Sequence, residues 1–191
     1  MLSGKKVKMS VRQAKLSDVP RLLEIDAEIW PDFRATREMF ESRIETFPQG
    51  QFVVVVDGLV VGSAYSELID YSVWSDKRFT WQEITNNGTI RQTHVVNGDS
   101  FYGVGMAVAK NFQGSVASEL LTKSAVKLVI TRNIRQILLG ARIPSYHKYA
   151  DRFLVEDYIK QTKGSRLLDP ELAFYGKYDG HPIKILPNYN I

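Results

Sequence analysis

Residues 7–15 alternate between apolar and polar side chains, which is the period of a strand with one buried face. The pattern then lengthens to that of a helix, which is expected to begin after Ser17 as its N-cap and to end before Pro31. A second helix is expected to run from Thr36, another N-cap candidate, to a break at Pro48. The chain is therefore predicted to open with one strand and two helices.

Two apolar runs rich in valine follow, at residues 51–56 and 59–65. The dipeptide Asp57-Gly58 separates them, and Asp-Gly between apolar strands is a strong signal for a hairpin. We therefore expect two antiparallel strands directly after the helices.

The next segment, at about 68–100, is polar and aromatic, and it is expected to be an insertion in the domain. Its turn signals favour a small extra hairpin built from residues 80–85 and 89–96. The segment also contains Trp74, Phe79 and Trp81. These aromatic residues favour an apolar binding surface, a lid or a contact with a second copy of the chain.

The second half of the chain continues with a strand at 101–109, a helix at 114–130 and a strand at 134–139. The remaining expected elements are short helices at 145–153 and 155–162 and last strands at 172–178 and 182–186. Strands interleaved with helices are typical of an α/β domain, in which helices cover both faces of a mixed sheet. Since no linker or repeat divides the chain, a single domain over residues 1–191 is expected.

The composition is that of an ordinary soluble protein, with 44% hydrophobic and 24% charged residues. The longest apolar run, residues 52–56, is too short to cross a membrane, and no targeting segment is visible at the start. The absence of cysteine excludes disulfides, thiolate metal sites and a cysteine nucleophile, and it fits a cytoplasmic location. The net charge of +4 is too weak and too dispersed to indicate a nucleic-acid partner.

The junction between the strand at 101–109 and the helix at 114–130 is the first candidate for chemistry. A strand that runs into a turn and then a helix presents unpaired N–H groups and a partial positive charge, which together suit a phosphate. Gly114 permits close backbone approach, and Ser115 and Ser118 add hydroxyl donors. A single glycine at such a junction also serves simply to make the turn.

Several further segments, together with the order of elements, resemble one family. They are Phe47–Phe52, Thr80–Thr85 leading to Thr93-His94 and Gly98-Asp99, Gly140–Tyr146, Asp169–Leu172 and Leu186–Tyr189. The chain resembles the GNAT superfamily of N-acyltransferases, and in particular the GNAT domain fused ahead of a carbon–nitrogen hydrolase (nitrilase-like) domain in many bacterial proteins. The resemblance covers almost the whole chain. It implies a mixed, mostly antiparallel central sheet and acetyl-CoA as co-substrate.

In that family the strand before the long helix binds the pantetheine arm through backbone groups, and the following turn binds the pyrophosphate. The residues implied for these roles are Met106, Ala107, Val108, Gln113, Gly114, Ser115, Val116, Ala117 and Ser118. The turn departs from the family pattern, because Asn111 stands where Arg or Gln is usual and Val116 occupies the second small position. This departure favours the alternative that the domain has lost catalysis.

Transfer of an acyl group from a thioester to an amine needs a base for the amine proton and an acid for the leaving thiolate. The resemblance implies a tyrosine acid after the strand at 134–139. Tyr149 has the family spacing from Arg142, although Arg replaces the usual Asn, whereas Tyr146 matches the fused subfamily. Glu67 is the first candidate base and His94 the second, and the other two histidines, His147 and His181, have weaker claims.

Three histidines without a spaced carboxylate pattern do not make a metal site, so no metal is expected. The basic residues that could pair with CoA phosphates, or simply form a solvated helix face, are Lys110, Lys123, Lys127 and Arg132. The expected function is direct transfer of an acetyl group from acetyl-CoA to an amine of a small molecule or protein. The alternative is a degenerate GNAT domain that senses an acyl-CoA or contacts another protein. A homodimer is left open, and neither nucleic acid nor a membrane is expected as a partner.

Overall fold

The structure, a computed structural model, describes residues 8–189 and forms two compact units. The first unit comprises the described residues up to Leu139, and the second comprises Gly140–Tyr189. Each unit is described by itself. A single domain with an insertion at about 68–100 stays a prediction.

A five-stranded sheet in the order β1-β2-β3-β4-β5 forms the centre of the first unit. Its strands are β1 (Met9–Gln13), β2 (Phe52–Val56), β3 (Leu59–Ile69), β4 (Ser100–Val108) and β5 (Gln136–Leu139). Neighbours pair antiparallel except β4 and β5, which are parallel. The predicted hairpin is confirmed, since Asp57 and Gly58 have φ values of 48° and 87°, the left-handed conformation of a tight hairpin turn.

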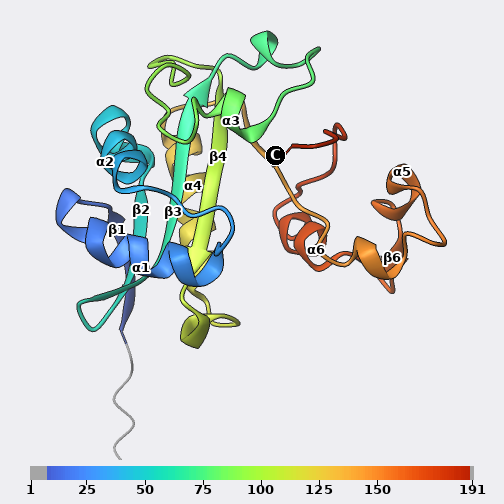
Figure 1. The fold of residues 1–191 in the computed structure, drawn as a ribbon, viewed down its shortest axis with the longest axis horizontal. Coiled ribbons are helices and arrows are strands. Elements are labelled where there is room, and N and C mark those ends of the chain that lie inside the picture. Colours follow the sequence, from blue (N-terminus) through green and yellow to red (C-terminus); the bar gives the residue numbers. More distant parts are fainter. Residues whose placement is uncertain (1–7, 190–191) are drawn as a thin grey trace, which may run out of the picture. The chain divides into compact units, whose positions relative to one another are not determined.

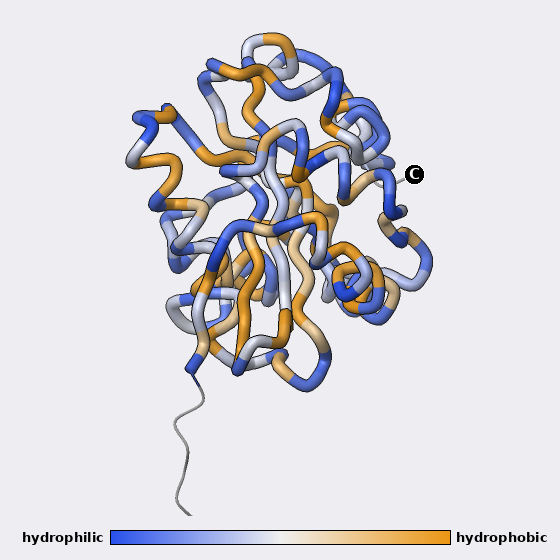
Figure 2. Tube along the Cα trace, turned by 90° about the vertical axis from the view of Figure 1, so that its left-hand side faces the viewer, coloured by the Kyte–Doolittle hydropathy of each residue, from blue (hydrophilic) through white to orange (hydrophobic). Residues whose placement is uncertain are grey.

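Helices cover both faces of this sheet, as predicted (Figure 1). The helices α1 (Val19–Ile29) and α2 (Arg37–Thr46) lie on one face, and α4 (Ala117–Thr131) lies on the other. The α4 face is a buried apolar cluster in which Ala117 and Leu121, both fully buried, pack against the valines of β2 and β3. Figure 2 shows the corresponding apolar stretches along the central strands. The α/β class and its mixed, mostly antiparallel sheet are therefore confirmed.

The boundaries of several elements differ slightly from prediction. The N-cap of α1 is Asp18 rather than Ser17, because a 3-10 turn, η1 (Leu16–Asp18), precedes the helix. Thr36 does cap α2, and its hydroxyl accepts the N–H of Met39 at 3.2 Å. The remaining 3-10 turns of the first unit are η2 (Pro48–Gly50), η3 (Tyr71–Val73) and η4 (Lys110–Phe112).

The predicted hairpin of residues 80–85 and 89–96 is wrong. Residues Trp81–Ile84 form a short helix, α3, and no strand occurs between β3 and β4 in this part of the described chain. Thr80 caps the helix, since its hydroxyl accepts the N–H of Glu83 while the Glu83 carboxylate accepts the N–H of Thr80 at 2.8 Å. This reciprocal capping box decides the local structure in favour of a helix.

The second unit also differs from prediction, because residues 172–178 and 182–186 are not strands. Pro170–Gly176 form a helix, α6, whose N-cap Asp169 accepts the N–H groups of Glu171 and Leu172. The predicted helix at 145–153 is reduced to a 3-10 turn, and the one at 155–162 to a single turn. The remaining elements of this unit are η5 (Tyr146–Lys148), α5 (Val155–Tyr158), β6 (Thr162–Lys163) and β7 (Arg166–Leu167).

Candidate functional site

The strand β4 has an open edge. Its first residues, Ser100–Gly103, pair with β5, but residues 104–108 have no strand partner on that side within the described chain. On its other side β4 pairs with β3 through a bulge, since Tyr65 lies opposite Gly105 and Ser66 lies opposite Gly103. Val104 is the extra residue of the bulge. A ligand with amide groups could therefore pair with the main chain along residues 104–108.

Two side chains donate hydrogen bonds to carbonyl groups along this edge, and Gly105 lies between them. The indole Nε1 of Trp81 donates a hydrogen bond to the carbonyl oxygen of Val104 at 2.9 Å, and the Gln113 side chain donates to the Val108 carbonyl at 3.4 Å. Gly105 is exposed, and a Cβ atom placed on it would meet nothing within 4 Å. The open space therefore lies directly at the bulge.

The turn between β4 and α4 brings the predicted phosphate-binding residues together. Gly114 has a φ of +77°, with no atom within 4 Å of an added Cβ, so the turn uses its left-handed conformation. The hydroxyl of Ser115 donates to the Phe112 carbonyl at 2.6 Å and accepts the N–H of Ala117 at 3.2 Å. The hydroxyl of Ser115 thus already stabilises the start of α4.

The predicted CoA-binding residues differ in how far they are exposed to solvent. Gln113, Gly114, Ser115 and Val116 are exposed, and Ser118 is half-buried. Met106 and Val108 pack partly against the α4 core, whereas Ala107 and Ala117 are buried. The Val116 side chain is 54% exposed, so it points outward and does not fill the turn. Glu119 adds a negative charge in the first turn of α4, which opposes an anion there.

Glu67 lies on β3 and is completely buried, at 0% exposure. Neither carboxylate oxygen has a hydrogen-bond partner of good geometry, and the same is true of the nearby Thr93 hydroxyl. Burial raises the pKa of Glu67 to about 8, although the Thr93 hydroxyl and the Arg43 charge act in the opposite direction. The carboxyl is therefore neutral over the acidic range and ionises only at mildly alkaline pH.

Arg43 of α2 is the main positive charge of the same buried region, with an exposure of 3%. Its Nε donates to the Gly88 carbonyl at 2.6 Å, and its guanidinium lies over the rings of Phe40, Tyr65 and Trp81 at 5.6, 5.1 and 6.0 Å. Burial lowers its pKa, while the charges around it, including Glu67, raise it. Sequence reasoning missed Arg43, because nothing in its helix distinguishes it from a solvated arginine.

His94 is held in one ring tautomer. Its Nδ1 accepts the N–H of Leu68 at 3.1 Å, so in the neutral ring the proton is on Nε2. The ring stacks on Phe47 with centroids 4.6 Å apart. Burial and the positive charge of Arg132 lower the pKa of His94. The lowered pKa favours the neutral ring, and the role of His94 as second candidate base stays a prediction.

Tyr146 and Tyr149 belong to the second unit, where both rings pack against Tyr158 at 5.1 and 5.6 Å. The Tyr146 hydroxyl donates to the Phe153 carbonyl at 3.0 Å. In the described part of the chain the structure gives the Tyr149 hydroxyl no hydrogen-bond partner. Between the two predicted acids, the proton of Tyr149 is thus the uncommitted one.

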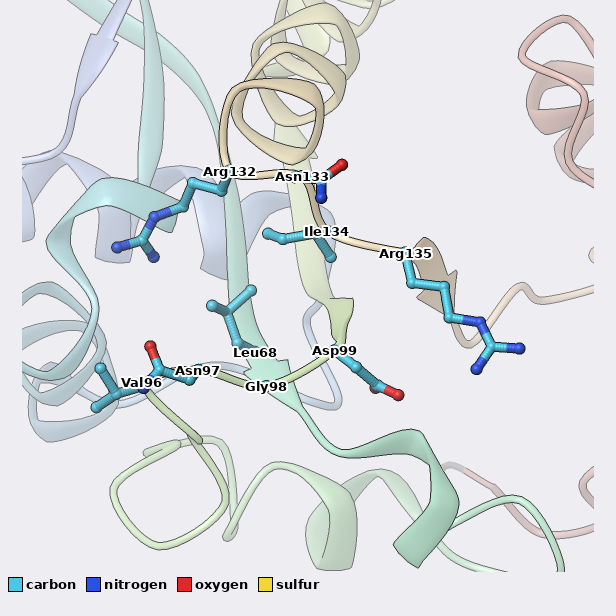
Figure 3. Close-up of a pocket in the computed structure, with 9 residues that line it drawn as sticks. All are labelled: Leu68, Val96, Asn97, Gly98, Asp99, Arg132, Asn133, Ile134 and Arg135. Atoms are coloured by element: carbon cyan, nitrogen blue, oxygen red, sulfur yellow. The ribbon is translucent and has the colours of Figure 1, made fainter.

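A hollow of about 480 Å³ lies at the opposite end of β4 from the turn. Its floor contains Leu68 and Ile134, and Arg132 and Arg135 flank it (Figure 3). The two guanidinium groups point away from each other in Figure 3, so their charges do not converge on one ligand position.

The comparisons with known proteins agree with the geometry of the first unit. The loading GNATL domain of CurA from Lyngbya majuscula superposes with a TM-score of 0.83 at 21% identity, over 96% of this chain and 89% of that one. The GphF GNAT-like decarboxylase, solved in complex with isobutyryl-CoA, gives a TM-score of 0.75 at 24% identity, over 88% and 84% of the two chains. The protein has a GNAT-like fold. At these identities the likeness establishes the fold of the GNAT-like domain and not its reaction.

Two curated relatives, both from Bacillus subtilis (strain 168), match 95% of this chain. The uncharacterized N-acetyltransferase YkwB is 26% identical, and the match covers 81% of its length. The probable hydrolase YhcX is 31% identical, but the chain spans only 35% of it. No family model matches the sequence. The resemblance to GNAT domains that are fused ahead of a hydrolase domain in other proteins stays an expectation.

Neither a metal-binding group nor a membrane-spanning helix occurs among the described residues. Over residues 8–189 no three His, Asp or Glu side chains are grouped so that they could hold a metal ion. No helix in that range has the length and apolar character needed to cross a membrane. The cytoplasmic location stays a prediction.

Proposed function

We propose that this GNAT-like domain transfers an acetyl or related acyl group from an acyl-CoA to an amine. The observation that carries the proposal is the open edge of β4 at residues 104–108, which leads directly into the turn before α4. The pantetheine arm of CoA carries two amide groups, which can pair with an unpaired strand edge. The residues proposed for this pairing are Met106, Ala107 and Val108.

The pyrophosphate is proposed to bind the turn of residues 113–118. This turn leads into a helix of 15 residues, whose first N–H groups lack partners within the helix. The outward position of Val116 supports the fit, because its side chain leaves the backbone accessible. The negative charge of Glu119 disfavours a pyrophosphate at the start of α4. We therefore expect CoA affinity to depend more on the strand edge than on the turn.

The proposed reaction is direct transfer. The amine nitrogen attacks the thioester carbonyl carbon, a C–N bond forms, and the C–S bond breaks to release the CoA thiolate. The ammonium form of the acceptor first loses one proton to a base, and the nitrogen loses a second proton as the amide forms. This second proton balances the one that the acid gives to the thiolate. Tyr149 is the proposed acid, because the hydroxyl of Tyr146 is committed to the Phe153 carbonyl.

Glu67 remains the proposed base. Burial raises its pKa to about 8, so the carboxyl is ready to accept a proton from an ammonium group only after it has ionised at mildly alkaline pH. Both of its oxygens are buried, however, so an acceptor could reach the carboxylate only after neighbouring side chains move. This burial favours the second candidate function, a domain that binds an acyl-CoA without turning it over.

Calorimetry of the full chain with acetyl-CoA and CoA tests the proposal, using Gly105→Val as the key variant. A valine here would occupy the open space at the bulge without meeting a protein atom near its Cβ. We expect at least a tenfold loss of affinity with an unchanged free energy of unfolding. Gly176→Val is the control, since its Cβ also meets nothing within 4 Å but the residue lies on α6.

Three outcomes discriminate among the candidates. An absence of heat at millimolar acetyl-CoA would overturn acyl-CoA binding altogether. Binding without CoA release over an amine panel would support the non-catalytic domain. Release of CO₂ from a carboxylated acyl-CoA would instead indicate the activity named for GphF.

A further inference from the structure

Arg43 and Glu67 are two buried ionisable groups of opposite charge that do not pair with each other. Arg43 is 3% exposed and Glu67 is 0% exposed. Among the described residues, no carboxylate oxygen lies within ion-pair distance of the Arg43 guanidinium. The charge of each group still acts on the pKa of the other through space. They therefore lie in one buried region, but too far apart to neutralise each other.

Several oxygens of this region are also without a partner. In the described chain the hydroxyls of Tyr65 and Thr93 and both carboxyl oxygens of Glu67 are buried and accept or donate no hydrogen bond. Tyr65 and Glu67 project from the same face of β3, because they are two residues apart on the strand. The Arg43 guanidinium lies over the Tyr65 ring at 5.1 Å. Since buried polar atoms in proteins normally have partners, this group of atoms is suited to bind a small polar molecule.

The molecule that complements these groups carries both charges. A carboxylate can accept two parallel hydrogen bonds from a guanidinium such as that of Arg43. An ammonium group can donate to the Glu67 carboxylate and offset the desolvation that raises its pKa. In an α-amino acid the two groups are attached to one carbon atom. A single small zwitterion can therefore lie between Arg43 and Glu67 and bind both.

Residues 85–93 cover the two ionisable groups. The Gly88 carbonyl accepts the Nε of Arg43 at 2.6 Å. The Thr93 hydroxyl lies close enough to Glu67 to act on its pKa. A carboxylate that displaced the Gly88 carbonyl would accept the Nε proton and one Nη proton of the same guanidinium, which is the bidentate geometry. Movement of this segment would therefore open both groups to a ligand.

The backbone of the same segment is strained. Asn86, Asn87 and Ile90 have φ values of 50°, 53° and 56°, in the left-handed region. This conformation is an outlier for a β-branched residue such as Ile90, so it persists only where surrounding contacts hold it. Strain of this kind lowers the free energy needed to open the segment, and it is found preferentially where ligands bind.

We propose that Arg43 and Glu67 form the acceptor site, and that the acceptor is an α-amino acid whose carboxylate binds Arg43 and whose ammonium group binds Glu67. This inference rests on the proposed function, in which Glu67 takes a proton from the acceptor. Glu67 lies opposite Tyr102 of β4, two residues before Val104 at the bulge, so the acceptor site borders the strand proposed for the acyl-CoA. The α-nitrogen attacks the thioester carbon, and the products are an N-acyl amino acid and free CoA.

Ligand analogues test the site on the unmodified chain. Calorimetry, with and without CoA at millimolar concentration, first measures the binding of each common α-amino acid. The amino acid that binds most tightly is then compared with its amide, which lacks the carboxylate, and with its des-amino acid, which lacks the ammonium group. We expect each analogue to bind more weakly by about tenfold or more, because each leaves one buried group without its charged partner.

Two conservative variants assign the two ends of the ligand. Arg43→Lys should weaken binding of the amino acid by about tenfold or more and leave binding of its amide unchanged. Glu67→Gln should weaken the amino acid similarly and leave the des-amino acid unchanged. Arg37→Lys and Glu45→Gln are the matched controls, since both residues are exposed on α2, and they should change neither affinity. If Arg43→Lys does not fold, the analogue series on the parent chain still decides the role of the carboxylate.

The failures of the two proposals can be told apart. Lack of acetyl-CoA binding by the parent chain would overturn the proposed function. Binding of acetyl-CoA without binding of any amino acid would overturn the acceptor site alone. Equal affinity for the amino acid and its amide, or equal rates of CoA release with the two, would also overturn it, because Arg43 would then recognise no carboxylate.

Discussion

At the residue scale, the fully buried carboxyl of Glu67 couples stability to pH. Burial raises its pKa in the folded state to about 8 from a reference value of 4.5. Between these pH values the folded chain keeps a proton that the unfolded chain has lost. Since the unfolded state then binds fewer protons, the free energy of unfolding falls as the pH rises through this window and levels off above it.

Glu67→Gln tests this coupling, because glutamine has a similar shape and cannot ionise. The variant should lose the decline in stability that Glu67 causes between about pH 5 and pH 8. At pH 7 the removed cost is on the order of 3 kcal/mol, since each unit of pKa shift corresponds to about 1.4 kcal/mol. Urea unfolding of both proteins at a series of pH values measures the difference.

Glu45→Gln is the control, because Glu45 is an exposed residue of α2. Its stability curve should run parallel to that of the parent chain. Parallel curves for Glu67→Gln as well would mean that the carboxyl is already ionised in the folded state. In that case Arg43, and not burial, would govern its pKa.

At the element scale, two errors of sequence interpretation have the same physical origin. Residues 80–85 contain aromatic and β-branched residues and residues 172–178 contain aromatic residues, and both kinds favour strands. In both places a cap at the helix start decides otherwise: Thr80 with Glu83, and Asp169 with Pro170 at the first helical position. These cap patterns are visible in the sequence. In short segments, cap residues therefore predict a helix or a strand better than amino-acid composition does.

Asp169 does more than cap α6. It is 1% exposed, and its oxygens accept hydrogen bonds from the N–H of Ser145, the hydroxyl of Tyr158 and two N–H groups of the helix. One carboxylate therefore connects three segments of the second unit. Removing it leaves several buried donors without an acceptor, which is a costly change.

Asp169→Ala is expected to destabilise the second unit by about 2–4 kcal/mol. Hydrogen exchange should become faster across residues 140–189 and stay unchanged in the sheet of the first unit. Asp151→Ala is the control, because Asp151 is exposed and makes only a surface ion pair with Arg152 at 3.8 Å. Equal effects of the two variants would contradict the central role of Asp169.

At the scale of the whole molecule, the order of strands and helices in the first unit was predictable from the sequence. The spacing of hydrophobic residues and the positions of turn-forming residues indicated the same elements there. The Asp57-Gly58 turn and the valines of β2 and β3 are examples. The open edge was not predictable, since it depends on where β5 ends opposite Gly103. The hydrogen bond from Trp81 to Val104 joins residues 23 positions apart, and no sequence pattern reports it.

The proposed acid, Tyr149, can be tested by a single substitution. Tyr149→Phe removes only the hydroxyl that is proposed to protonate the leaving thiolate. This interaction develops in the transition state, so turnover should fall by about 100-fold while the acetyl-CoA dissociation constant stays within about threefold.

Tyr146→Phe separates catalysis from packing. Its hydroxyl donates to the Phe153 carbonyl, so its loss should cost about 1 kcal/mol of stability and leave turnover unchanged. Full turnover in Tyr149→Phe would remove the acid assignment. If Tyr146→Phe instead lost turnover, the hydroxyl that donates to Phe153 would be the acid. It would then have to leave the Phe153 carbonyl during each catalytic cycle.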